Sequence, residues 1–115
     1  MSRAEEEKEK EEEERYNRIL KALGNTKRRK ILNLIKDQPR TTSDLCNSLN
    51  GFDRCTVMQH LGVLEEADLI VVRHKGKYRW NYINLFPIKE IHDRLISNYS
   101  INSLDLLSKL KKDLE

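Results

Sequence analysis

Apolar residues recur every three or four positions through much of the chain, which is the spacing of one buried helix face. In the first two-thirds this pattern predicts four helices: residues 4–23, 26–37, a short helix that follows Thr41 or Thr42 and includes Leu45 and Leu49, and 53–67. Thr26 and Asp53 are residue types that cap helix N-termini. Gly24 ends the first pattern, and Pro39 lies just beyond the second.

The pattern changes to strand-like alternation after the fourth helix. Residues 69–73 and 78–83 are rich in β-formers and flank Lys75-Gly76, so we expect a hairpin. The second strand separates two faces, with Tyr78, Trp80 and Tyr82 on one and Lys77, Arg79 and Asn81 on the other. A hairpin needs one covered face, so we expect the aromatic face to pack on the helices. The alternative is an exposed stacking platform for single-stranded nucleic acid.

Two further helices are expected after the hairpin. Pro87 precedes a helical pattern that ends at about residue 97, and a last one is marked by Leu104, Leu107, Leu110 and Leu114. The predicted fold class is mainly α with a small β-hairpin. Its order, helix-helix-helix-helix-hairpin-helix, is typical of a winged helix-turn-helix. We expect residues 1–15 to be an acidic, Glu-rich extension, disordered or helical, and residues 16–115 to form one domain.

Composition narrows the class of protein. Of the 115 residues, 37% are hydrophobic and 36% are charged, which leaves little apolar surface for a core, so burial against a second copy is expected. There is no apolar run of the ~18 residues that a membrane helix needs, and no secretory leader pattern. Two cysteines are too few for a disulfide framework. We therefore expect a soluble, cytoplasmic protein.

The net charge of +3 is unevenly distributed along the chain. Residues 1–15 hold eight Glu against four Lys/Arg, whereas residues 16–80 hold thirteen Lys/Arg against six Asp/Glu. Residues 81–115 hold five of each. The positive excess therefore surrounds the fourth helix and the hairpin, which favours a polyanionic partner such as DNA.

The fourth helix has one apolar side and one polar side. At about 100° per residue, Val57, Leu61 and Leu64 share a face, while Cys55 and Gln59 lie opposite. Glutamine bonds adenine bidentately in the major groove, and threonine donates to phosphate or touches a thymine methyl. Arg54 lies nearer the packed side, so we expect it to contact phosphate. His60 is expected on the packed side. We predict that the helix contacts DNA through Arg54, Cys55, Thr56 and Gln59. The hairpin is predicted to contact phosphates or the minor groove through Arg73, Lys75, Lys77 and Arg79.

Residues 17–97 resemble the ArsR-type (arsenical-resistance repressor) family of winged-helix regulators. The runs that carry the resemblance are 22–28 (ALGNTKR), Ile31-Leu32, Leu34-Ile35, Asp44-Leu45 and above all 56–69 (TVMQHLGVLEEADL). The resemblance implies a homodimeric transcriptional regulator, usually a repressor, that binds double-stranded DNA. It also implies dimerisation through the first and last helices, here residues 4–23 and 88–113.

The chain departs from that family at its metal sites. Thr41 and Ser43 stand where many members have Cys-x-Cys, and they are poor ligands for soft metals. His92-Asp93 alone is too few ligands for a second family site. We therefore expect no metal and no cofactor. Asp68 replaces a usual glycine, which is tolerable because aspartate adopts left-handed backbone more readily than most residues.

Two alternative functions remain open from the sequence. Cys46 and Cys55, nine residues apart, are a possible redox pair, with Cys55 the more reactive because it lies near a helix N-terminus. A second alternative is a protein-interaction module on the same fold that pairs through its acidic first helix. We do not expect an enzyme, because there is no phosphate-binding loop, no Ser/His/Asp set at a recognisable spacing and no pair of carboxylates in an apolar setting.

Overall fold

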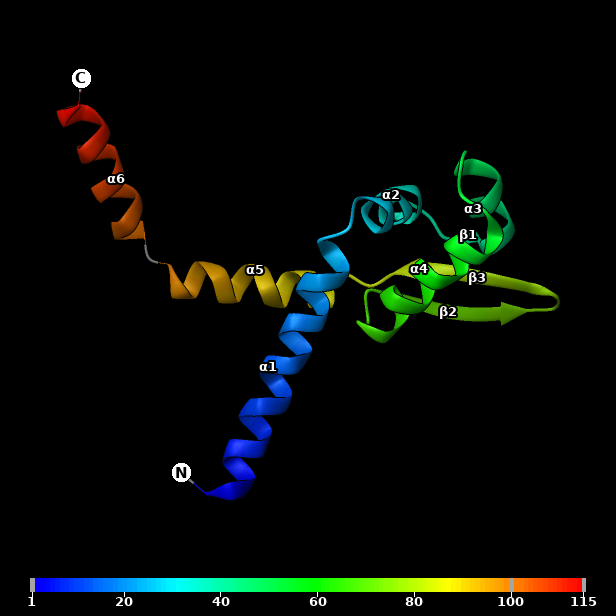
Figure 1. Cartoon of the computed structure of the whole chain (residues 1–115), viewed down its shortest axis with the longest axis horizontal. Helices are drawn as coiled ribbons and strands as arrows, with labels where there is room; N and C mark the ends of the chain where they lie inside the picture. Colours follow the sequence, from blue (N-terminus) through cyan, green and yellow to red (C-terminus); the bar gives the residue numbers. More distant parts are fainter. Residues whose placement is uncertain (1, 100, 115) are drawn as a thin grey trace.

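Six helices and three short strands make up the computed structural model, which describes residues 2–99 and 101–114 (Figure 1). Their order is α1 (Arg3–Leu23), α2 (Thr26–Ile35), β1 (Arg40–Thr41), α3 (Thr42–Ser48), α4 (Arg54–Glu66), β2 (Ile70–Lys75), β3 (Tyr78–Ile83), α5 (Phe86–Asn98) and α6 (Ile101–Asp113). The predicted helices, the hairpin and their order are confirmed. The Glu-rich run is helical and continuous with the rest of α1.

The first four helices begin at side chains that accept a hydrogen bond from a free backbone N–H of the first turn. Asp53 Oδ1 accepts from the N–H of Thr56 at 2.7 Å, and Thr41 Oγ1 accepts from Asp44 at 3.1 Å. The prediction of Thr26 as a cap was wrong. Asn25 holds that position in an extended conformation and accepts from the N–H of Arg28, while Thr26 is already helical.

The strands form one antiparallel sheet in the order β1-β3-β2. The two-residue strand β1 was not predicted, because it is too short to show an alternating pattern. The hairpin ladder extends to the pair Lys75–Tyr78, so the turn residues are Gly76 and Lys77 and not the predicted Lys75-Gly76. Gly76 has a φ of +61°, which glycine adopts without steric cost.

The core lies where α1–α5 meet the sheet. Val57, Leu61 and Leu64 of α4 are fully buried, as predicted. The other buried apolar residues include Ile19, Ala22, Ile31, Leu32, Ile35, Leu45, Leu49, Leu69, Ile70 and Ile91. Truncating one of these large residues to alanine typically costs about 2–5 kcal/mol. Asp68, the residue after the C-cap of α4, has a φ of +59°, as expected for a residue in the place of a family glycine.

The predicted orientation of the hairpin was wrong. The face that packs on the helices carries Ile70, Val72, Asn81 and Ile83, and Asn81 is fully buried. Its Nδ2 donates to the carbonyl of Arg40 (3.2 Å) and to Thr42 Oγ1 (3.1 Å), so β1 and α3 supply acceptors for the buried amide nitrogen. Tyr78, Trp80 and Tyr82 therefore lie on the outer face, where Tyr78 is 47% exposed.

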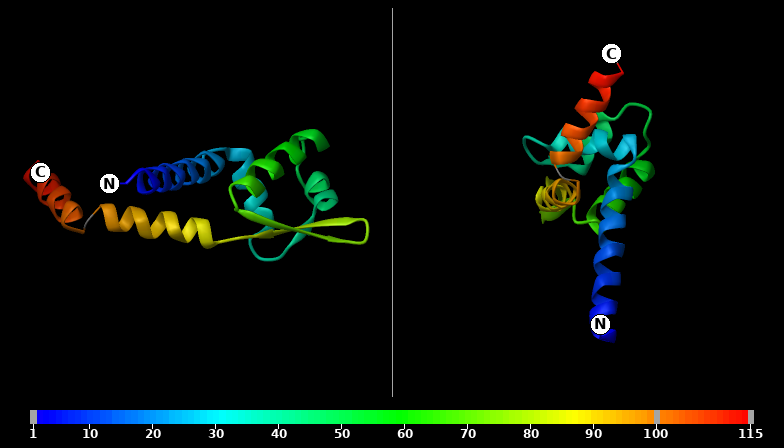
Figure 2. Two further views of the ribbon diagram at one scale, coloured as in Figure 1. Left: turned by 90° about the horizontal axis from the view of Figure 1, so that it is seen from below. Right: turned by 90° about the vertical axis from the view of Figure 1, so that its left-hand side faces the viewer.

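The molecule is extended. Its radius of gyration is 18.9 Å, against about 13 Å for a compact chain of this length. The acidic half of α1 projects from the core, and α5 and α6 extend away from the side that carries the hairpin (Figures 1 and 2). Among the described residues no helix is both long and apolar enough to cross a lipid bilayer.

Candidate nucleic-acid interface

The N-terminal part of helix α4 exposes polar side chains to solvent, because the apolar side of the helix is buried. Arg54, Cys55 and Gln59 are exposed, and Thr56 is half-buried. The backbone N–H of Thr56 bonds to the carboxylate of Asp53, and this bond is the main reason that the pKa of Asp53 lies below its usual value. The predicted helix contacts therefore lie together on a surface whose first turn is held in place by a cap.

The hairpin carries three exposed cations. Arg73 and Lys75 lie across the ladder from Trp80 and Tyr78, on the outer face of the sheet, and Lys77 lies in the turn. Lys75 Nζ donates to the hydroxyl of Tyr82 at 3.3 Å. Lys77 Nζ lies 5.4 Å from the centre of the Tyr78 ring, within the range of a cation–π contact. These cations and aromatic side chains form one surface, the basic face of the wing.

Arg79 is placed differently from the other predicted contacts. It lies on the inner face of the sheet, where its Nη2 is 3.1 Å from a carboxylate oxygen of Glu65 on α4. Its Nη1 is 3.5 Å from the sulfur of Met58, and only 19% of its side chain is exposed. Arg79 thus joins the wing to α4. Glu65 was not predicted in this role, because no local spacing relates residues 65 and 79.

His60 packs on the inner side of α4, as predicted. Its ring lies beside the guanidinium of Arg28, with Nδ1 3.3 Å from Nη1. Burial lowers the pKa of His60, and the nearby charges of Arg28 and Lys27 lower it further. The ring therefore favours its neutral form.

The two cysteines, which are the candidate sensing residues, differ in exposure to solvent. Cys46 is a half-buried thiol on α3, and Cys55 is an exposed thiol on α4. His92 Nδ1 lies 3.3 Å from Asp93 on the exposed surface of α5. Across residues 2–99 and 101–114, no three His, Cys, Asp or Glu side chains are grouped as a metal ion would require.

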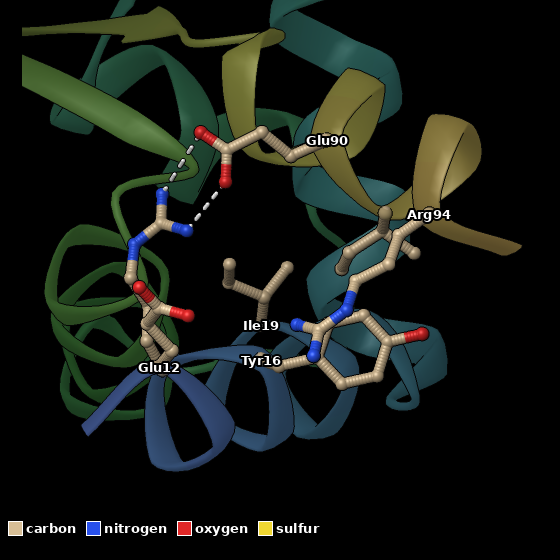
Figure 3. Close-up of a pocket in the computed structure, with 7 residues that line it drawn as sticks. Glu12, Tyr16, Ile19, Glu90 and Arg94 are labelled. Carbon is tan, nitrogen blue, oxygen red and sulfur yellow. Dashed lines mark hydrogen bonds and ion pairs between the residues drawn. The ribbon is translucent and has the colours of Figure 1, made fainter. Parts of the chain in front are cut away.

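A cleft of about 240 Å³ lies between α1 and α5 (Figure 3). Arg15 donates two hydrogen bonds to Glu90 across it, and the guanidinium of Arg94 stacks 4.4 Å from the centre of the Tyr16 ring. Arg94 also lies 3.3 Å from Glu13. Since these charged groups pair with one another, the cleft is best explained as the seam that holds α5 against α1.

Comparison with known proteins agrees with this geometry. A family model described as a helix-turn-helix domain matches residues 18–73. The transcriptional repressor SdpR of Bacillus subtilis (strain 168) is 31% identical over 74 residues, which cover 64% of this chain and 81% of that protein. The uncharacterized HTH-type transcriptional regulator YuzN of the same organism is 34% identical over 79 residues, covering 64% and 86%.

Solved structures share the fold. The crystal structure of an ArsR family transcriptional regulator, 26% identical, has a TM-score of 0.68 over 74% of this chain and 87% of its own. An ArsR-like regulator from Rhodococcus sp. RHA1, 17% identical, has a TM-score of 0.71 over 88% and 94%. The likeness at 17% identity shows the fold alone. Together with the relatives at 31% and 34% identity, these matches show that the chain belongs to the ArsR-type winged helix-turn-helix transcriptional regulators.

Proposed function

We propose that this protein is a homodimeric repressor that binds specific double-stranded DNA sequences. Helix α4 enters the major groove, and the β2–β3 wing contacts phosphates or the neighbouring minor groove. The observation that carries the proposal is that one chain exposes both the polar N-terminal surface of α4 and the cations Arg73, Lys75 and Lys77 of the wing. SdpR, one of the relatives, is a repressor, which supports repression over activation as the role of this protein.

The assignment of roles follows from side-chain chemistry. Gln59 is the base-reading residue, because its amide can donate to and accept from one adenine edge. Arg54 and Thr56, in the first turn of α4, bind phosphate at the groove edge, and Cys55 faces the bases between them. Arg73, Lys75 and Lys77 add sequence-independent affinity by neutralising phosphates.

Homodimerisation is supported by the apolar surface that one copy leaves open. Large apolar side chains of α5, of its C-cap residue and of α6 are exposed: Leu95 39%, Ile96 60%, Tyr99 70%, Leu104 64%, Leu107 46% and Leu110 57%. An apolar surface this extensive marks an association site. A second copy covers it in the proposed dimer, together with α1, and two α4 helices then face one DNA duplex. A winged helix-turn-helix domain of Mycobacterium bovis that shares the fold (20% identical, TM-score 0.61) is homodimeric.

The signal to which the protein responds differs from that of metal sensors with the Cys-x-Cys pair, since Thr41 and Ser43 occupy those positions. Thr41 is itself engaged as the N-cap of α3. We place the protein in the cytoplasm, where its DNA target is accessible.

Selection of bound sites from random duplex DNA, followed by a salt titration, tests the proposal. We expect an inverted repeat whose half-sites lie about one helical turn, or a multiple of it, apart. The affinity should fall steeply with salt concentration. Enrichment of no sequence, or of single half-sites bound by a monomer, would overturn the dimeric DNA-reading role.

A further inference from the structure

One arginine connects three helices of the domain. Arg28 lies in the first turn of α2, and its Nε donates to the carbonyl of Ala22 at 2.8 Å while its Nη2 donates to the carbonyl of Lys21 at 3.0 Å. Both carbonyls belong to the last turn of α1. The remaining arm, Nη1, lies 3.3 Å from Nδ1 of His60 on α4. A single planar cation therefore joins the end of α1 to the proposed reading helix.

The chemistry of each partner suits this position. The last carbonyls of a helix lack partners within the helix and carry the negative end of its dipole, so they favour a cation. A guanidinium offers five N–H donors in a rigid fork and no acceptor. His60 must therefore accept at Nδ1, which requires the neutral ring protonated at Nε2. Lysine has one donor centre, and it cannot reach all three acceptors.

The adjacent arginine provides a comparison within the same turn. Arg29 Nη1 donates to the carbonyl of Leu23 at 2.7 Å, and its Nη2 to Thr26 Oγ1 at 3.4 Å. Arg29 thus also binds the end of α1, but its hydrogen bonds among the described residues stay within the α1–α2 corner. Reaching α4 distinguishes Arg28 from Arg29.

We propose that Arg28 is a positioning residue that, through His60, holds α4 at a set angle to α1 and so determines the affinity for the specific DNA site. This inference rests on the proposed function, in which α1 belongs to the dimer interface and α4 reads the groove. Two half-sites lie ~34 Å apart or a multiple of it, so both α4 helices must be placed correctly at once. A small rotation of α4 disturbs base contacts but leaves the attraction between cations and phosphates intact.

Protonation of His60 should break the same link. A protonated ring turns its Nδ1 acceptor into a donor that faces the guanidinium. The charged groups that face His60 are Arg28 and Lys27, both cations of α2, and they oppose the added charge. The affinity for the specific site should therefore fall as the pH is lowered below the ordinary range of a histidine.

The first test compares Arg28→Lys with Arg29→Lys in the full chain, since both variants keep the net charge. Affinities are measured for the selected site and for a random duplex at one salt concentration. We expect Arg28→Lys to lose at least about tenfold for the selected site and less than about twofold for the random duplex, a factor of ten being about 1.4 kcal/mol. Arg29→Lys should change neither by more than about twofold.

The second test uses His60→Gln and His60→Leu, so that the proposal stays testable if Arg28→Lys fails to fold. Glutamine keeps an acceptor for Nη1 and does not titrate; leucine does not titrate either, but it has no acceptor. We expect the glutamine variant to retain specific affinity and to lose the acid-induced decrease of the wild type, and the leucine variant to bind weakly at every pH.

Three results would overturn the positioning role: equal losses in Arg28→Lys and Arg29→Lys, parallel losses for selected and random duplexes, or equal weakness of the two His60 variants. None of these three results would contradict sequence-specific DNA binding by the wild type. A wild type that selects no DNA sequence overturns the proposed function itself, and the positioning role with it.

Discussion

The guanidinium of Arg79, on the wing strand β3, lies 3.1 Å from the carboxylate of Glu65 near the end of α4. The contact joins the two parts of the proposed DNA interface and sets the wing against the helix. Because Arg79 is paired with a carboxylate of the protein, its charge is not free to bind phosphate. The wing therefore carries three exposed basic side chains, Arg73, Lys75 and Lys77, and a fourth that is already paired.

Replacing Glu65 with glutamine should strengthen DNA binding irrespective of sequence. The change removes a negative charge beside the interface and frees Arg79 for phosphate, so the salt slope should steepen by about 1. The pair is partly exposed, and its loss should lower the free energy of unfolding by only about 0.2–1 kcal/mol. Salt titrations on random duplex DNA measure the first effect and urea unfolding the second. Glu66→Gln is the matched control, because Glu66 is exposed and has no ion-pair partner among the described residues; equal effects in both variants would argue against a specific role for the pair.

Lys75→Ala should weaken binding to all duplexes by a similar factor and reduce the salt slope by about 1, because an exposed lysine of the wing contributes through phosphate neutralisation. Binding isotherms at several salt concentrations provide the slope. Lys109→Ala removes the same charge from α6, far from the wing (Figure 1), and should leave the slope unchanged. A slope that is the same in Lys75→Ala and the wild type would exclude Lys75 from the interface.

Gln59→Ala should change which sequence is preferred. Loss of a bidentate contact with a base typically costs about 1–3 kcal/mol at that base pair, while binding to random DNA is unaffected. Repeating the site selection with the variant should show relaxed choice at one position in each half-site. Gln38→Ala, in the exposed loop after α2, is the control with the same chemical change. An unchanged selected sequence in Gln59→Ala would show that another residue reads the bases.

Stability should decrease on mild acidification because of His60. Its pKa is lower in the folded protein than the ordinary value of 6.5, so below about pH 6.5 the unfolded chain binds the extra proton more readily. The neutral ring of His60 therefore makes its full contribution to the free energy of unfolding above that pH. The contribution declines as the pH falls towards the lowered pKa. Urea midpoints at pH 7.5 and 5.5 should differ more in the wild type than in His60→Gln. Asp53 does not contribute in this window, because its lowered pKa places its effect below about pH 3.8. Equal pH dependence of the two proteins would contradict the prediction.

Modification of Cys55 should block DNA binding. Its thiol is exposed in the first turn of α4. In the proposed complex a bulky adduct on it would clash with the floor of the DNA major groove. We expect an alkylating reagent to label Cys55 before the half-buried Cys46, and binding to be lost in step with labelling of Cys55. The Cys55→Ser variant should bind DNA and resist the reagent. Two free thiols after mild oxidation, with unchanged DNA affinity, would exclude the alternative that Cys46 and Cys55 form a redox pair.

Local signals in the sequence were enough to predict the six helices and the hairpin, and to show the resemblance to the family. Helix α4 was predictable because its buried residues recur at helical spacing and Asp53 is a good cap, and both signals are local. The hairpin followed from two runs of β-formers around a glycine. The predicted candidate contacts on α4 are exposed, apart from the half-buried Thr56, because the same periodicity that buries Val57, Leu61 and Leu64 leaves the opposite side free.

The way in which these elements face one another depends on contacts between residues far apart in the sequence. Alternation along β3 shows which residues share a face but not which face is covered, and the partners that Arg40 and Thr42 offer to Asn81 turned the polar face inward. The pairing of Arg79 with Glu65 and the reach of Arg28 to His60 likewise join residues 14 and 32 positions apart. Local periodicity carries no information about such contacts, because they depend on the relative placement of packed helices and sheet.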